Sequence, residues 1–317
     1  MASPEKKLWI ENYRPRKMSE IILPSRLKNQ FEAMVKEGEI PNLLLAGNAG
    51  AGKTTIARVL ANELNCDFYM INGSEESGID VLRTKVKSFA ATMSVMSESK
   101  HKIMCIDEAD YLNASSTQPA LRGLMEEYWQ NCRFIFTCNN KSRIINPLHS
   151  RCTVIDFSFS KEEKQAMMAA FFKRALAILN ENNVKVDQRA LATYIQSMFP
   201  DFRRILNELQ RYATCGEIDS GILKMTGDEA ISEIITFLKS KNFREMRSWV
   251  DMNPEIEVAS LFEKLYSQLP DVLMPESVPE LILVLDEYQT KALSALNAKI
   301  NIAACLTQLM ATIHFKN

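Results

Sequence analysis

One stretch, Gly47–Thr54, restricts the fold of this 317-residue chain more than any other. It reads Gly-Asn-Ala-Gly-Ala-Gly-Lys-Thr and follows the apolar run Leu43–Ala46, which predicts a short buried strand. The residues after it, Thr55–Ala61, have the pattern of a helix. A glycine-rich turn between a strand and a helix is typical of a phosphate-binding loop, because its backbone N–H groups and the helix N-terminus point at an anion. The sequence therefore predicts an α/β nucleotide domain.

The side chains of this loop suit a nucleotide with bound magnesium. Lys53 is long enough to reach the β- and γ-phosphates, and the Thr54 hydroxyl is a magnesium ligand by type. The predicted loop contacts to the nucleotide, in chain order, are Gly47, Gly50, Ala51, Gly52, Lys53, Thr54 and Thr55. A chance match in a glycine-rich loop is the alternative, and the flanking strand and helix count against it.

A second apolar run, Lys102–Ile106, predicts a buried strand that ends in the acids Asp107 and Glu108. In a P-loop ATPase, the first acid would hold Mg²⁺ through water and the second would polarise the attacking water. Adjacent acids are also common in turns, which is the alternative. Water as the acceptor favours ATP hydrolysis over the transfer chemistry of a nucleotide kinase.

Other predicted site residues follow shorter signals. The strand that begins at Arg133 ends in amides, and Asn139 there would bridge the γ-phosphate and the attacking water, or would simply form a turn. The segment Trp9–Pro15 places aromatic residues beside a basic one, which suits a purine ring or a plain surface arm. The short apolar stretch Ile21–Pro24 is expected to line the same pocket.

Composition excludes several classes of protein. The formal net charge is −1, so any contact with nucleic acid must come from local patches or helix N-termini. The seven cysteines form no Cys-x-x-Cys pair and the three histidines lack metal-ligand spacing, which indicates free thiols in a reducing compartment. No apolar signal region or membrane-length run occurs, so we expect a soluble, intracellular protein without membrane contact.

The periodicity changes from mixed to helical near residue 158. We expect an α/β domain at 1–158, a small helical domain at 159–227 and a second helical domain at 228–317. In the last part the pattern predicts breaks near Asn253–Pro254, Pro270 and Pro275. It also predicts one long final helix from about Tyr288 to Ile313.

Together these motifs resemble an AAA+ ATPase, and within it the ATP-hydrolysing small subunits of sliding-clamp loaders of the replication factor C type. Gly47–Thr54 is similar to Walker A, Ile103–Glu108 to Walker B, and Thr137–Asn140 to sensor 1. Ser150–Cys152 resembles the Ser-Arg-Cys signature, and Phe199–Arg203 resembles sensor 2. The Pro-Asp-Phe-Arg form of sensor 2 is similar to loader subunits of T-even-type bacteriophages. The glycine after Arg122 departs from the two consecutive arginines that are usual in cellular small subunits.

The resemblance implies further site residues. An adenine-side box would comprise Ile10, Glu11, Asn12 and Tyr13, with Ile22 nearby. Three catalytic roles would fall to Asn72, a switch residue that holds the catalytic Glu, to Arg203, the sensing arginine, and to Arg151, an arginine finger for a neighbouring subunit. A surface arginine paired with a local acid is the alternative for Arg151.

The resemblance also implies a fold and partners. A parallel-sheet AAA+ domain would precede a helical lid and an all-α collar. ATP, with Mg²⁺, would stabilise a ring-like pentamer of further copies and a large subunit. This assembly would open a sliding clamp, and primer–template DNA would trigger hydrolysis and clamp release. If phage-encoded, the chain would act in the cytoplasm of a bacterial host.

Two surfaces are expected to meet these partners. Arg83, Lys87 and Arg122 would contact DNA phosphates, and solvated helix charges are the alternative, chiefly for Lys87. The clamp surface would comprise Phe89, Met93, Val95 and Met96, and core packing is the alternative, chiefly for Phe89. Two other functions stay open: another DNA-associated AAA+ motor, such as a helicase loader or branch-migration motor, and a non-hydrolysing structural subunit.

Overall fold

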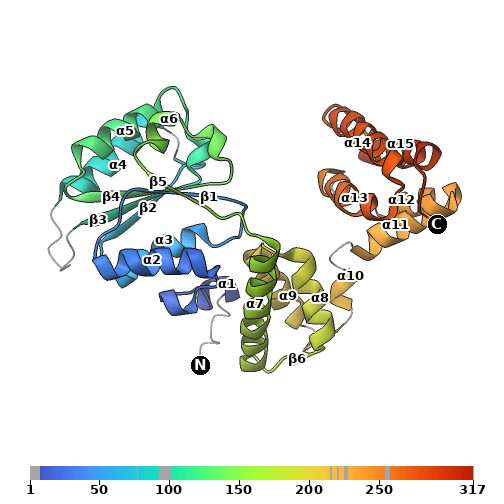
Figure 1. Ribbon diagram of the computed structural model, residues 1–317, viewed down its shortest axis with the longest axis horizontal. Coiled ribbons are helices and arrows are strands. Elements are labelled where there is room, and N and C mark those ends of the chain that lie inside the picture. The colour runs from blue at the N-terminus through green and yellow to red at the C-terminus, as the bar shows by residue number, and fades with distance from the viewer. Residues whose placement is uncertain are drawn as a thin grey trace, which may run out of the picture. The chain divides into compact units, whose positions relative to one another are not determined.

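The chain divides into two compact units in the computed structural model, Met1–Asp219 and Ser220–Asn317 (Figure 1). The residues described are 8–76, 78–92, 101–214, 216–219, 221–224, 228–253 and 258–316. The first unit contains both the α/β part and the helices that the sequence analysis assigns to a lid. The second unit is helical.

The first unit is built on a five-stranded sheet in the order β2-β3-β4-β1-β5. The strands are β1 (Leu43–Ala46), β2 (Phe68–Asn72), β3 (Lys102–Asp107), β4 (Cys132–Cys138) and β5 (Thr153–Asp156). All neighbouring pairs are parallel, with Leu43 opposite Ile135 on one side and Thr153 on the other. The predicted parallel α/β domain is therefore confirmed, and the loops that follow β1, β3 and β4 meet at one edge.

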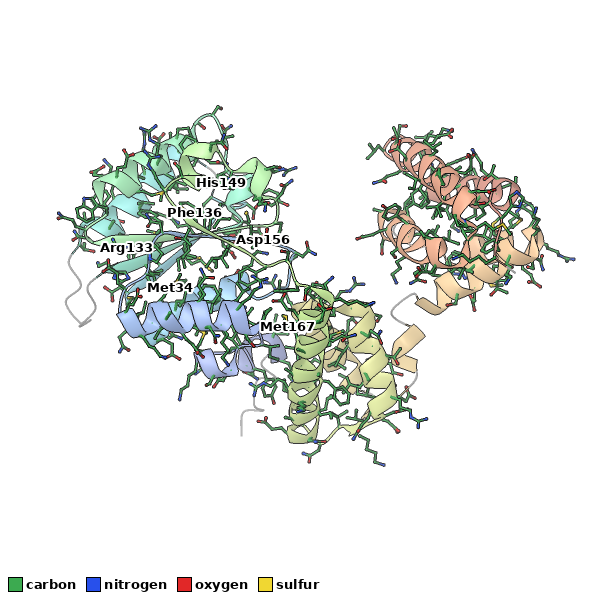
Figure 2. All side chains as sticks on the ribbon, viewed as in Figure 1. Met34, Arg133, Phe136, His149, Asp156 and Met167 are labelled. Atoms are coloured by element: carbon green, nitrogen blue, oxygen red, sulfur yellow. The ribbon has the colours of Figure 1, made fainter. Side chains whose placement is uncertain are left out.

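Helices cover both faces of this sheet (Figure 1). On one face, α2 (Ser25–Glu37) and α3 (Lys53–Glu63) share a core with Leu43 and Leu45. On the other, α4 (Ile79–Ala91) and α5 (Thr117–Glu127) share a core with Leu44 and Ala46. Neighbouring strand residues point to opposite faces, so an unbroken apolar run fits a strand that is covered on both sides. Figure 2 labels Met34 and Phe136, which belong to these two cores.

Short elements link the sheet to its surroundings. They are α1 (Trp9–Asn12), η1 (Met18–Glu20), η2 (Ala109–Tyr111), η3 (Lys141–Arg143) and α6 (Asn146–His149). The lid helices are α7 (Lys161–Glu181), α8 (Gln188–Met198) and α9 (Phe202–Ala213), beside the paired strands β6 (Lys185–Val186) and β7 (Glu217–Ile218).

The lid helices begin where their capping residues predict. Ser160 and Glu163 form a capping box at α7, and Asp201 accepts a backbone hydrogen bond at the start of α9. The N-terminal segment is tied to this lid, because the Trp9 backbone N–H donates to Gln210 Oε1 at 2.8 Å. Asn182 Nδ2 also donates to the Tyr13 hydroxyl at 2.8 Å. Trp9 is buried, so the segment is more than a surface arm.

The second unit begins with α10 (Gly221–Lys224) and continues with α11 (Asp228–Ser240), α12 (Phe243–Met252) and α13 (Val258–Val272). It ends with η4 (Pro275–Ser277), α14 (Val278–Ala292) and α15 (Ala298–Thr312). Its core includes Leu265, Leu269, Leu285, Leu306 and Leu309. Among the described residues, none of the helices in either unit combines the length and apolar character that crossing a membrane requires.

Two expectations for this unit are wrong. The predicted single helix from Tyr288 to Ile313 is interrupted, because Asn297 accepts hydrogen bonds from the Lys299 and Ile300 backbone N–H groups and so starts α15 anew. Apolar spacing carries on through the interruption, which hid it from the pattern. Pro270 does not break its helix, which continues to Val272. Proline lacks a backbone N–H, so Pro270 costs this helix one hydrogen bond, and only two helical residues follow it.

Candidate active site

A cavity of about 320 Å³ lies in the first unit, where the loops after β1, β3 and β4 meet the N-terminal segment and the lid. Parallel α/β sheets bind ligands at this edge. The predicted residues that line it are Ile10, Tyr13, Ile22, Gly50, Ala51, Gly52, Lys53, Thr54, Thr55, Asn72, Asp107, Glu108, Asn139 and Arg203. Segments far apart in the chain thus converge on one site.

Some predicted residues lie elsewhere. Glu11 forms an ion pair with Arg14 at 2.8 Å, and neither Glu11 nor Asn12 lines the cavity. Gly47 is also outside its lining, and its backbone N–H donates to Cys138 O at 3.1 Å.

The lid supplies cavity residues that the sequence analysis missed. They are Phe171, Arg174 and Ile178 from α7, and Phe202 and Leu206 from α9. On each helix these residues are three or four positions apart, so they share one face. Helical periodicity predicts such a face but not that it lines a cavity.

Lys53 is buried at the base of the cavity and is fully engaged within the chain. Its Nζ donates to the backbone oxygens of Gly47 and Asn48 at 2.8 Å each, and to Asn139 Oδ1 at 3.0 Å. Burial lowers the pKa of the Lys53 ammonium, and neighbouring groups that include Asp107 oppose this shift. Phosphate oxygens entering the loop would replace these acceptors.

Asp107 connects the phosphate-binding loop to the ends of two strands. Its Oδ1 accepts a hydrogen bond from the Thr54 hydroxyl at 2.8 Å and another from the Thr137 hydroxyl. The Thr137 oxygen in turn accepts the backbone N–H of Glu108 at 3.1 Å. Thr137 was predicted as part of the strand and of the motif similar to sensor 1, and its contacts now show that it helps to orient both acids.

The same oxygens fit a magnesium ion. The Thr54 hydroxyl and the Asp107 carboxylate converge at the cavity, and Mg²⁺ prefers oxygen ligands. The described part of the chain contains no cluster of three or more His, Cys, Asp or Glu side chains suited to a metal. An ion at this place would therefore take its remaining ligands from phosphate and water, as Mg²⁺ commonly does in such sites.

Glu108 has an unusual backbone conformation, with a φ of +55°. A residue with a side chain loses about 1–2 kcal/mol in this left-handed region, and such outliers concentrate at functional sites. The turn directs Glu108 to the cavity lining. Asn72, on the neighbouring strand, uses its Oδ1 to accept hydrogen bonds from Ser74 N at 3.1 Å and Ser74 Oγ at 2.9 Å. Its predicted role in holding Glu108 stays a prediction.

The loop that carries Asn139 is anchored by a buried acid. Asp110 Oδ2 accepts the backbone N–H groups of Asn139 and Asn140, at 3.2 and 3.1 Å. This contact places the Asn139 side chain beside Lys53. The Asn139 amide therefore lies at the loop lysine, on the lining of the cavity.

Arg203 is the second residue of α9 and lines the cavity from the lid. It is close enough to Lys53 for its positive charge to lower the pKa of that ammonium further. Arg174 adds another cation to the lining. A bound triphosphate would neutralise this concentration of positive charge.

Arg151 does not line the cavity of its own chain. Its Nε donates to Glu126 Oε1 at 2.8 Å and its Nη1 donates to Pro147 O at 2.9 Å. This pair lowers the pKa of the Glu126 carboxyl. Arg122 lies 3.6 Å from the same carboxylate oxygen. The local acid pair expected as the alternative for Arg151 is therefore present in the single chain.

The other predicted contact residues lie on α4 and α5. Arg83, Lys87 and Arg122 are exposed. Phe89 is half-buried, and its ring packs against Tyr69 at 5.5 Å between ring centres. Met93, Val95 and Met96 lie outside the described residues.

Comparisons with known proteins agree with this geometry. Residues 43–159 match the ATPase family associated with various cellular activities (AAA). Residues 163–224 match the family described as sliding-clamp-loader large subunit, AAA+ ATPase lid domain. A solved structure of Thermotoga maritima RuvB, a Holliday junction branch migration motor, covers 80% of this chain and 85% of its own, with a TM-score of 0.52 and 20% identity. That likeness shows the fold alone.

Curated relatives are more similar. The sliding-clamp-loader large subunit of Escherichia phage RB69 is 32% identical over 312 residues, which cover 96% of each chain. The replication factor C small subunit of Archaeoglobus fulgidus is 36% identical over 320 residues, covering 95% of this chain and 97% of its own. The phage name says large where the archaeal name says small, so the size label depends on the system. By fold, site and sequence, the chain belongs to the sliding-clamp-loader family of AAA+ ATPases.

Proposed function

We propose that this chain is the ATP-hydrolysing subunit of a clamp loader that serves DNA replication, with ATP and Mg²⁺ bound in the cavity described above. Asp107 and Thr54 would hold the ion, and Lys53 would neutralise the phosphates. Glu108 would polarise the attacking water, while Asn139 and Arg203 would orient the γ-phosphate.

The observation that carries this proposal is the hydrogen-bonded unit of Thr54, Asp107 and Thr137, with Glu108 turned beside it. Asp107 is bonded to the Thr54 hydroxyl, and Glu108 lines the same cavity as Lys53, which supports one acid as a magnesium ligand and the other as the base. A subunit that only bound nucleotide would not need the strained turn at Glu108.

The test is the Glu108→Gln variant, with Glu37→Gln as the matched control. Glu37 is exposed at the end of α2 and does not line the cavity. Glu108→Gln should bind ATP as the unaltered chain does and should hydrolyse it about 10²–10⁴-fold more slowly, the usual contribution of a general base. Glu37→Gln should retain full turnover. An unchanged ATPase rate in Glu108→Gln would refute the assignment.

The proposed partners follow from the relatives. We propose assembly with further copies of this chain and with a companion loader subunit, binding of a sliding clamp, and contact with primer–template DNA. The sequence analysis expected a large subunit as the companion. Since the phage relatives themselves bear that name, the companion's relative size is not part of the proposal.

Stimulation by partners separates this function from its alternatives. ATP hydrolysis by the purified chain and its companion should rise when clamp and primed DNA are added together. Stimulation by DNA with no effect of the clamp would indicate another DNA motor. ATP binding without turnover under all conditions would indicate a structural subunit.

A further inference from the structure

The lid touches the phosphate-binding loop at one glycine. A Cβ placed on Gly50 would lie 2.0 Å from Asp201 Oδ1 and 3.0 Å from the Asp201 Cα. Real Cβ atoms do not approach other atoms this closely, so Asp201 occupies the space that a side chain at position 50 would need. Gly50 also has a φ of +72°, a conformation that favours glycine. The loop thus needs a glycine here for two reasons: the backbone conformation and the space taken by Asp201 of the lid.

Asp201 is fixed at the start of α9. Its Oδ1 accepts the backbone N–H of Arg204 at 3.0 Å, which is an N-cap hydrogen bond. The next residue, Phe202, packs its ring against Phe171 of α7 with 4.6 Å between ring centres. Asp201 therefore moves with the lid, and any shift of its carboxylate shifts the first turn of α9.

That first turn carries Arg203, which faces the cavity. Only one residue separates it from Asp201 in the sequence, so the contact at Gly50 and the position of the arginine are mechanically linked. A loop whose backbone at Gly50 moved toward Asp201 would push the start of α9, and Arg203 with it. Because this turn packs through Phe202 against Phe171, and close-packed side chains transmit strain, the shift would be passed on rather than absorbed locally.

We propose that Asp201 is a positioning residue: through its contact with the Gly50 backbone it couples the conformation of the phosphate-binding loop to the placement of Arg203 over the cavity. This inference rests on the proposed role of Arg203 in nucleotide hydrolysis. It differs from a direct role for Asp201, whose side chain is not among the cavity-lining groups.

The chain offers a matched control for the glycine. Gly52 lies in the same loop with a φ of +93°, and the described residues bring no atom within 4 Å of where its Cβ would stand. Gly50→Ala and Gly52→Ala therefore impose comparable backbone strain, and only the first imposes a clash with the lid. Asp201→Ser removes the clashing carboxylate yet keeps an N-cap, because serine caps helices about as well as aspartate.

The experiment is a double-mutant cycle in the full chain assembled with its companion subunit. Gly50→Ala should lower kcat/KM for ATP, and adding Asp201→Ser should restore about tenfold of that loss, a coupling typical of residues in contact. The recovery is expected to be partial, because the Asp201 Cα stays close to position 50. Asp201→Ser should give no recovery in Gly52→Ala. Asp201→Asn, which keeps the shape, should resemble the unaltered chain.

Two further measurements separate positioning from structure. In an Arg203→Ala background, Asp201→Ser should have no added effect on kcat, because the group that it positions is gone. Thermal unfolding of the unliganded variants reports the contact itself, independently of catalysis. Coupling in the melting temperature with additive effects on kcat/KM would make the contact merely structural and overturn the proposal, as would equal recovery in Gly52→Ala.

Failure of the proposed function looks different. If the unaltered assembly hydrolysed no ATP, the ATPase assignment would fall. The cycle would then be measured in the affinity for ATP, where absence of coupling between positions 50 and 201 would overturn the present inference by itself.

Discussion

Arg151 gives the sharpest test of how two copies of this chain cooperate. We expect that Arg151 acts on the nucleotide of a neighbouring subunit, because it lies outside the cavity of its own chain. The perturbation is Arg151→Ala. Removing an arginine finger lowers turnover by about 10³–10⁵-fold in comparable phosphoryl-transfer sites, which corresponds to about 4–7 kcal/mol of transition-state stabilisation.

The structure predicts that other properties hardly change. The Arg151 side chain is 33% exposed and its partner Glu126 is 49% exposed, so solvent screens the pair. We expect a melting temperature within about 3 °C of the unaltered chain. ATP affinity should stay within about twofold, because no contact to the chain's own cavity is lost. A large loss of turnover with intact stability and binding is the expected signature.

The assay is a mixing experiment. Arg151→Ala and Lys53→Ala should each be inactive when assembled alone. In an equal mixture, some interfaces join an intact loop lysine to an intact arginine of the neighbour. If copies mix at random in a head-to-tail ring, about a quarter of the interfaces are complete, and about that share of ATPase activity should return.

Two results would refute this reasoning. If mixed complexes form and no activity returns, while Arg151→Ala binds ATP normally, the residue does not act between subunits. If Arg151→Ala alone retains full clamp- and DNA-stimulated turnover, it is a surface arginine held by Glu126 and nothing more.

The remaining predictions concern DNA, the clamp and pH. Arg122→Ala and Arg83→Ala should each weaken binding equally to unrelated duplexes and reduce the slope of log K against log salt by about one, whereas sequence-selective losses would contradict phosphate contact. Met93→Glu combined with Met96→Glu should reduce binding of the sliding clamp and leave basal ATPase activity intact; retained affinity would exclude this surface. Burial lowers the pKa of Lys53 in the folded chain below its ordinary 10.5. At a pH between the folded and the unfolded pKa, the unfolded chain binds more protons than the folded one. Lys53 therefore makes the free energy of unfolding rise with pH in this range. Urea unfolding across the alkaline range should show a smaller rise in Lys53→Met, and equal slopes would argue against the lowered pKa.

The sequence alone determined the parts of the site that are contiguous in the chain. The loop Gly47–Thr54 predicts a phosphate site because phosphate binding needs a particular run of backbone and side-chain groups. The two acids at the end of β3 are likewise recognised from one short segment. The strands before these segments could be predicted as well, since a strand that is buried on both faces is a nearly continuous apolar run. Residues whose role depends on one short segment could thus be predicted without the fold.

Tertiary structure decided what depends on contact between distant segments. The sequence predicted Thr137 in a strand and in the motif similar to sensor 1, but only the parallel sheet sets its hydroxyl beside Asp107, which lies thirty positions earlier. The sequence predicted Gly50 as a loop contact to the nucleotide, whereas its close approach to Asp201 of the lid exists only in the folded chain. The sequence did not predict the break before α15, because Leu293 and Leu296 continue the apolar periodicity although both are exposed. Periodicity records which residue types recur, whereas only the packed chain determines which atoms meet.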